Sequence, residues 1–369
     1  MANNTLLEST IESARLYSNL EKTILAKELI EKGVIVSTDD VKKKVHLKSL
    51  DISNIIQQTI RTRTECIKDI EKWEFEKAYK YSIFYDIKSV DIGIIKKMIL
   101  SGKIFDFEND PDKYENQHLR ITESSIPSLR IMDGKYVLKF NVRLRRFEIN
   151  NKEISVRYPI CVIIDIENNF MEVRCDGYPG LYDGDKFQHI EDIVAWLKTN
   201  AYIYVSTIDM YPTMKAIITD IDSIMDKYKG KVHITWQDMR LKKGGKATVG
   251  CNKDGNLPFV DELKNFLNEN MDLFNKVLEL KSKYERFIKQ TIKLADYPAV
   301  KIIFDELKGM EAKIVFNYEK KNFSLIQHYV DDTQDSCKKE RMEYVSDFIF
   351  ENRKNHIEKT LEQKSVSCV

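Results

Sequence analysis

The sequence predicts an α+β protein with a helical N-terminal region, a central antiparallel β-meander, and a C-terminal mixed region that has long helices and a small second sheet. Three observations predict this class. Near both ends of the chain, apolar residues recur at steps of three and four, which is the period of an amphipathic helix. Between Ser128 and Asp176, apolar and polar residues alternate in four successive runs, which is the period of half-buried strands. In the last third of the chain, three short strand-like runs lie between long helical patterns.

The helical N-terminal region covers residues 1–119. Amphipathic helical patterns occupy Thr5–Lys32, Ser49–Asp86 and Ile92–Leu100. The segment Phe105–Glu115 then holds five carboxylates and one lysine, together with the turn-forming pair Asp110-Pro111. We therefore expect an exposed acidic loop at the end of this region.

The meander and the helices that follow it cover residues 120–230. In Tyr136–Leu144 every second residue is apolar, so one face of this strand should be buried. Turns are expected at Asp133-Gly134, Asn150-Asn151 and Asn168-Asn169, because these residue types tolerate a positive φ. After Leu144 the apolar positions shift by one residue, to Phe147 and Ile149, which predicts a β-bulge near Arg145-Arg146.

The mixed C-terminal region covers residues 231–369. A strand is expected in Lys231–Trp236, and the glycine-rich segment Arg240–Asn256 should be a loop or a loose hairpin. The helical pattern of Pro258–Leu294 is too long for one ordinary globular helix, so it predicts either a rod or a helical hairpin broken near Asn268–Asn270. The small sheet and the closing helix are expected at Val300–Phe304, Lys313–Tyr318, Phe323–Tyr329 and Lys338–Glu362.

Composition limits the classes of function. The 369 residues include 59 Lys and Arg against 58 Asp and Glu, so any attraction to a polyanion must come from local patches. The six cysteines are scattered without a CxxC pair, which indicates reduced thiols rather than a disulfide framework or a zinc site. No apolar run approaches the ~18 residues that a membrane span requires. We therefore expect a cytoplasmic protein without a membrane partner.

The first candidate site is the polar face of the meander. Strand alternation places basic side chains from several strands on one face, together with the carboxylate of Glu172. Arginine presents a planar fork to phosphate oxygens, so such a face could bind a polyanion. The alternative is a solvated or helix-covered face on which the arginines pair with nearby acids. The basic residues are Lys139, Arg143, Arg145, Arg157 and Arg174.

The second candidate site is the segment Lys227–Lys253, which has eight basic residues and one acid, a net charge of +7. Its glycines would let backbone N–H groups approach an anion. The phosphate-binding P-loop motif is absent, because Arg240 and Ala247 stand where that motif needs a glycine and a hydroxyl. With only Trp236 and Tyr228 for base stacking, the segment predicts sequence-nonspecific contact with nucleic-acid backbone. Its central basic residues are Arg240, Lys242, Lys243, Lys246 and Lys253.

A third signal is a set of residues of the kind that metal-dependent nucleases use. Two carboxylates can hold Mg²⁺ or Mn²⁺ while a lysine assists the attacking water. Asp305, Glu311 and Lys313 have these residue types at close spacing. A second set, Asp165, Glu172 and Arg174, has an arginine in the lysine position, and arginine cannot serve as a base. The alternative is that Asp305–Lys313 is an ordinary charged turn.

Together, these signals favour a cytosolic, non-enzymatic protein that binds nucleic-acid backbone or another polyanion through local basic patches and needs no cofactor. One alternative is a protein-protein interaction subunit, such as a regulatory or phage-defence component, whose long helices dock on copies of itself or on a partner. The other alternative is a metal-dependent nuclease, for which alone Mg²⁺ or Mn²⁺ is expected.

Overall fold

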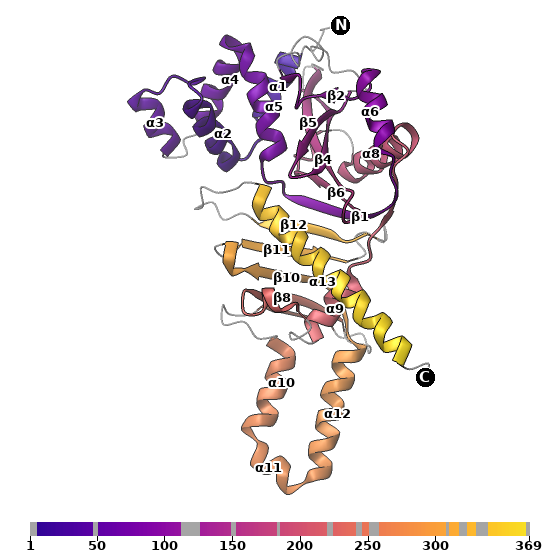
Figure 1. Ribbon diagram of the computed structural model, residues 1–369. Coiled ribbons are helices and arrows are strands. Elements are labelled where there is room, and N and C mark those ends of the chain that lie inside the picture. Colours follow the sequence, from indigo (N-terminus) through magenta and orange to yellow (C-terminus); the bar gives the residue numbers. More distant parts are fainter. Residues whose placement is uncertain are drawn as a thin grey trace. The chain divides into compact units, whose positions relative to one another are not determined.

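Figure 1 shows the computed structural model of the chain. It describes residues 6–46, 51–111, 126–148, 153–182, 185–219, 224–240, 246–250, 258–307, 310–316, 323–329 and 339–366. The chain divides into two compact units. The first unit comprises Met1–Thr207 with Asp332–Lys339, and the second comprises Ile208–Asp331 with Glu340–Val369.

The first unit begins with five helices whose apolar faces share one core. Their buried side chains include Ile11, Leu29, Ile56 and Ile70, which pack in one cluster with Val137 of the sheet. Ser18 begins the second helix with a capping box, in which its side chain and that of Glu21 bond reciprocally to the backbone. The helices are α1 (Leu6–Ala14), α2 (Asn19–Glu31), α3 (Asp39–His46), α4 (Ile52–Thr62) and α5 (Ile67–Glu76).

The strands of the first unit follow the order β2-β3-β4-β5-β6-β1, and β7 also pairs with β1. All of these pairs are antiparallel except β2 with β3. Asp133 (φ 50°) and Gly134 (φ 77°) form the tight turn between β3 and β4, as their residue types predict. The strands are β1 (Tyr81–Ser89), β2 (Phe105–Asp106), β3 (Ser128–Met132), β4 (Lys135–Phe147), β5 (Glu153–Asp165), β6 (Phe170–Cys175) and β7 (Tyr204–Thr207).

The two faces of this sheet carry different side chains. Helices α1 and α5 lie over the face that includes Lys139 and Arg157 (Figure 1). On the opposite face, Phe140 makes an edge contact with Trp196 of α8 (Lys186–Asn200), with 5.2 Å between ring centroids. A further helix, α6 (Ile92–Leu100), follows β1 in the chain.

The strands of the second unit follow the antiparallel order β12-β11-β10-β8-β9. Phe304 of β10 packs against Tyr344 and Phe348 of the last helix, with ring centroids 5.9 and 5.3 Å away. The strands are β8 (Val232–Arg240), β9 (Lys246–Gly250), β10 (Asp296–Phe304), β11 (Met310–Val315) and β12 (Leu325–Tyr329), and the helices at the two ends of this unit are α9 (Tyr211–Thr219) and α13 (Lys339–Val366).

The long helical pattern of this unit is a hairpin rather than a rod. It consists of α10 (Pro258–Glu269), α11 (Met271–Lys276) and α12 (Leu278–Leu294), and we call these residues the arm (Figure 1). The first break falls at Asn270, at the edge of the predicted segment. Tyr284 of α12 closes the hairpin by donating a hydrogen bond to the carbonyl oxygen of Leu263 of α10, at 3.3 Å.

The predicted α+β class is confirmed, with N-terminal helices, a largely antiparallel arrangement of strands and C-terminal helices. A separate small second sheet is not shown. Of the helices that the structure describes, none combines the length and the hydropathy of a membrane span.

Three local predictions were wrong. Tyr81–Asp86 is part of strand β1 rather than of a helix. Phe105 and Phe107 are buried, so the predicted exposed loop Phe105–Glu115 does not begin at Phe105; Glu108 and Asn109 are exposed, and residues 112–115 lie outside the described residues. The register between β4 and β5 runs without a shift from Tyr136 to Phe147, so there is no β-bulge near Arg145.

Candidate functional site

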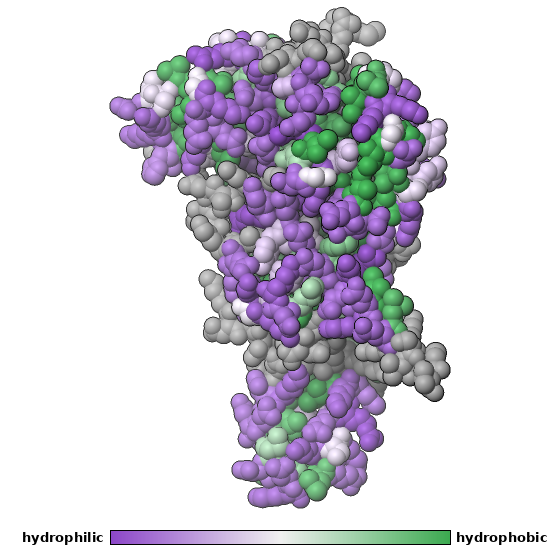
Figure 2. Space-filling model, in the orientation of Figure 1, coloured by the Kyte–Doolittle hydropathy of each residue, from purple (hydrophilic) through white to green (hydrophobic). Residues whose placement is uncertain are grey.

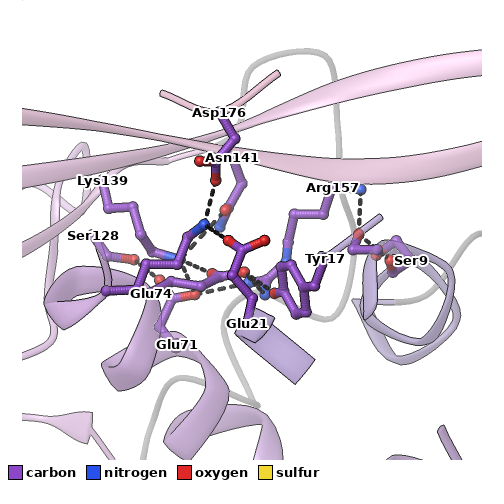
Figure 3. A network of polar contacts seen from close by, with 12 residues as sticks. Ser9, Tyr17, Glu21, Glu71, Glu74, Ser128, Lys139, Asn141, Arg157 and Asp176 are labelled. Atoms are coloured by element: carbon purple, nitrogen blue, oxygen red, sulfur yellow. Dashed lines mark hydrogen bonds and ion pairs between the residues drawn. The ribbon is translucent and has the colours of Figure 1, made fainter. Parts of the chain in front are cut away.

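Four charged side chains meet between α5 and the sheet of the first unit (Figure 3). Lys139 of β4 binds both Glu71 and Glu74 of α5, and its Nζ lies 2.5 Å from Oε2 of Glu74. Arg157 of β5 binds the same two carboxylates at 2.8 Å each. All four side chains are 0% exposed. Two cations thus balance two anions inside the protein.

The local sequence explains how these groups meet. Glu71 and Glu74 are three residues apart on α5, so they project from the same side of the helix. Hydroxyl groups complete the network: Ser128 donates to Glu71 at 2.9 Å and Tyr17 donates to Glu74 at 2.5 Å. Burial, and then the negative charge of Glu74, raise the pKa of Tyr17 well above its usual value. Tyr17 is therefore a neutral hydrogen-bond donor at physiological pH.

A third buried cation, Lys77, lies beside this network. Its Nζ donates to Glu21 at 2.6 Å and also to Asp176, and it lies 4.4 Å from the ring centroid of Tyr79. Burial raises the pKa of Asp176 to about 6, although the attraction of Lys77 opposes that shift. The Asp176 carboxyl therefore titrates closer to neutral pH than an ordinary aspartate.

This network is where the structure places part of the predicted basic face. The side chains of Lys139 and Arg157 are inaccessible to an external polyanion, and Arg174 is buried in a bidentate pair with Glu172, with both N–O distances at 2.8 Å. The alternative interpretation, a helix-covered face whose cations pair with acids, describes these three residues.

The other two residues of the predicted basic face are half-buried. Arg143 lies opposite Arg157 in the β4–β5 register and pairs with Glu153 at 2.7 Å. Arg145 lies opposite Ser155 near the end of the same strand pair. The structure therefore places all five residues on neighbouring strands, but it puts three of them in the interior.

The second candidate site lies at one end of β8 and β9, which pair as a hairpin. Arg240, an exposed residue, stands opposite Lys246 in the register, so the chain between them connects the two strands at a basic end. Lys242, Lys243 and Lys253 lie outside the described residues. Of the two rings, Trp236 is half-buried with Lys313 Nζ 4.8 Å from its ring centroid, whereas Tyr228 is buried.

The nuclease residues have separate partners. Oδ2 of Asp305 lies 2.8 Å from Nε2 of His233, Glu311 pairs with Lys301 at 3.4 Å, and Lys313 lies over the ring of Trp236. In the other set, Asp165 accepts a hydrogen bond from the Asn168 side chain at 3.0 Å, while Glu172 pairs with Arg174. Within the described ranges, no group of three or more histidine, cysteine or carboxylate side chains is placed to hold a metal ion.

The arm of the second unit exposes large apolar side chains, which Figure 2 shows as green patches among hydrophilic residues. Phe274, Leu267 and Ile288 are buried inside the hairpin, and Phe274 and Tyr284 have ring centroids 5.3 Å apart. The following residues of the same arm have exposed fractions of half or more: Phe266 (52%), Leu273 (62%), Val277 (51%), Leu278 (69%), Leu280 (52%), Phe287 (54%) and Leu294 (50%).

Two features were missed in the sequence, although each left a signal. Glu71 and Glu74 lie within one turn of the apolar residues Ile70 and Trp73, which indicates acids near a buried helix face. In the arm, the apolar residues are too many for one seam between two helices. The surplus indicated a second apolar face.

No protein-family model matches this chain, and no curated protein resembles it at a significant level. The buried network has each of its charges paired within the chain, whereas the arm and the β8–β9 hairpin present side chains to the outside.

Proposed function

We propose that this protein is an interaction subunit that docks a protein partner through the arm, residues Pro258–Leu294. One observation supports the proposal: seven large apolar side chains on this one element are half or more exposed. The arm is a short part of the chain, yet it carries seven of the seventeen exposed large apolar side chains among the described residues.

Single exposed apolar side chains are ordinary on protein surfaces, but a cluster of them marks an interaction site. Burying one large apolar side chain stabilises an interface by about 1.5–3 kcal/mol relative to leaving it in water. Two of the seven are phenylalanines, Phe266 and Phe287, and aromatic residues are enriched in the centre of protein interfaces. The arm therefore has the composition of a docking element.

The test uses the full chain with Leu278→Glu and Phe287→Glu together. Both side chains are exposed, so the variant should keep its fold and its circular dichroism spectrum. We expect that proteins which co-purify with the wild type from its native cell will be absent with this variant. The matched control is Leu100→Glu, at an 88% exposed position at the end of α6, which should retain them. Equal recovery with all three proteins would contradict the proposal.

A second candidate function is sequence-nonspecific binding of nucleic-acid backbone at the β8–β9 hairpin. The supporting observation is that Arg240 and Lys246 stand opposite each other at the end of a segment with a net charge of +7. Phosphate contacts release counterions, so the affinity should fall steeply as salt is raised.

A filter-binding titration with single- and double-stranded DNA and RNA tests this second function. The affinity of the wild type should fall with salt along a negative slope of log affinity against log salt. In the double variant Arg240→Glu with Lys246→Glu, we expect this slope to become shallower by about 0.9 for each phosphate of duplex DNA that is no longer neutralised. Arg240→Glu and Lys246→Glu are also made separately, and Lys88→Glu, at an exposed position on β1, is the control that changes the net charge by the same amount as either of them. If the wild type retains no nucleic acid at low salt, this second function is excluded. Incubation of the protein with the same nucleic acids and Mn²⁺ tests the nuclease alternative, which predicts cleavage.

A further inference from the structure

The exposed apolar residues of α12 follow a regular spacing. Leu280, Phe287 and Leu294 are seven residues apart, so they lie on one face of the helix. Thr291 stands between Phe287 and Leu294 in the same pattern, and Tyr284, between Leu280 and Phe287, lies at the border with the face that closes the hairpin. This spacing is typical of a seam that packs against another helix in a coiled coil or bundle.

The hairpin uses a neighbouring face of α12 for its own closure. Ile288 is 5% exposed, and Tyr284 contacts Phe266 and Phe274 at centroid distances of 5.9 and 5.3 Å. The Leu280–Phe287–Leu294 face is therefore additional to the one that holds α12 to α10. A helix with two adjacent apolar faces fits a bundle of more than two helices.

The two halves of the arm carry opposite charge. Pro258–Lys276 has four acids and two lysines, a net charge of −2, whereas Leu278–Leu294 has five basic residues and two acids, a net charge of +3. An arm of this kind complements another copy of itself when the acidic half of one faces the basic half of the other.

Two charged residues mark where these halves would meet. Glu269 is three residues after Phe266 and four before Leu273, and Lys283 is three residues after Leu280 and four before Phe287. Glu269 therefore lies beside Phe266 on α10, and Lys283 lies beside Leu280 and Phe287 on α12. The contact between the rings of Phe266 and Tyr284 places the two regions at the same level of the arm. Lys283 also pairs with Glu279 at 2.6 Å, but both side chains are exposed, so that pair opposes a new contact only weakly.

From these observations we propose that the arms of two copies of this chain pair as a four-helix bundle, with α10 and α11 of one copy against α12 of the other. The two-fold axis runs along the arm, so Glu269 of each copy faces Lys283 of the other, and every contact occurs twice. The inference rests on the proposed function, because it names the partner that the arm docks.

Sedimentation of the full chain over a range of concentrations tests the pairing. We expect a reversible dimer for the wild type and for the control Leu100→Glu. Glu269→Lys or Lys283→Glu alone would place like charges together twice, and should raise the dimer dissociation constant by about tenfold or more. Combined in one chain, the two changes should restore the wild-type value to within about threefold. Leu280→Glu should give a monomer.

Three results would overturn the pairing: a wild-type chain that stays monomeric, a dimer that survives Leu280→Glu, or a double charge swap that stays as weak as the single changes. Capture of a different protein, or of lipid vesicles, by a monomeric wild-type chain in an arm-dependent way would overturn self-pairing while leaving the arm as an interaction element. If the wild type is monomeric and the arm variant also captures the same proteins as the wild type, the proposed function fails as well.

Discussion

Lys139 in the first unit and Phe287 in the arm of the second unit both lie where their residue types are uncommon. The Lys139 side chain is 0% exposed, and Phe287 is 54% exposed. Large apolar residues are usually buried, and lysine is almost never fully buried without a partner. The two regions thus invert the usual distribution of side chains, in opposite directions.

The difference between the regions is where the partners come from. Lys139 finds Glu71 and Glu74 within the same chain, so the network is complete and its contribution is to the fold of the first unit. The apolar side chains on the surface of the arm are half or more exposed, and we propose that their partner comes from outside the chain. Buried charge indicates a structural role here, and exposed apolar surface indicates a binding role.

The largest expected effect is in the buried network. Lys139→Met should lower the free energy of unfolding of the first unit by about 3–5 kcal/mol, because removing one member of a buried ion pair leaves an unbalanced charge in the interior. Hydrogen exchange of the β4 and β5 amides would measure this loss. Arg143→Met on the same strand removes a partly exposed pair with Glu153 and should cost at most about 1 kcal/mol.

A second change separates charge imbalance from reduced packing. Glu71→Gln, added to Lys139→Met, removes the carboxylate charge that Lys139 no longer balances, so the double variant should be more stable than Lys139→Met alone. If Lys139→Met costs no more than Arg143→Met, the network is not a structural element and the contrast with the arm disappears.

A smaller effect is expected from pH. Burial raises the pKa of Asp176 from its usual value of 3.8 to about 6, so the folded protein binds this proton more tightly than the unfolded chain does. The contribution of Asp176 to the free energy of unfolding is therefore greatest below pH 4 and falls as pH rises to about 6.

The variant Asp176→Asn lacks this titration. The difference in stability, wild type minus variant, should fall by on the order of 1 kcal/mol between about pH 4 and pH 6. Thermal unfolding across that range measures it. If this difference grows with pH, the attraction of Lys77 outweighs the effect of burial, and the pKa of Asp176 is lowered rather than raised.

The sequence predicted the meander well because its signals are local. Alternation and the pair Asp133-Gly134 depend on adjacent residues, and β3 to β6 lie where these signals place them. Strand β1 was missed because Ser82–Tyr85 is buried on both faces and does not alternate. A continuous apolar run next to a helical pattern cannot be distinguished from helix by its period.

The sites were harder to predict for a related reason. Alternation correctly placed Lys139 and Arg143 on one face, but it gave no indication of what covers that face. Glu71 is 68 residues from Lys139, and only the packing of α5 on the sheet brings them together. In the arm, the apolar pattern predicted helices, but only the hairpin geometry separates the side chains that hold it together from those on its surface.

The smallest expected effect is at two adjacent residues of α12. Ile288 is 5% exposed and Phe287 is 54% exposed. In dilute solution, where the chain is a monomer, Ile288→Ala should destabilise the arm by about 2–4 kcal/mol because it leaves a cavity. Phe287→Ala should change its stability by no more than about 0.5 kcal/mol, since 54% of this residue is exposed and its ring contacts Tyr284 only at a centroid distance of 6.4 Å. Hydrogen exchange of the α12 amides measures both.

Raising the protein concentration should stabilise the wild-type arm but not the Phe287→Ala arm, because only the wild type acquires a partner for this ring. Equal costs for the two variants in dilute solution would show that Phe287 packs within its own chain, and the arm would then lack the open face that its docking role requires.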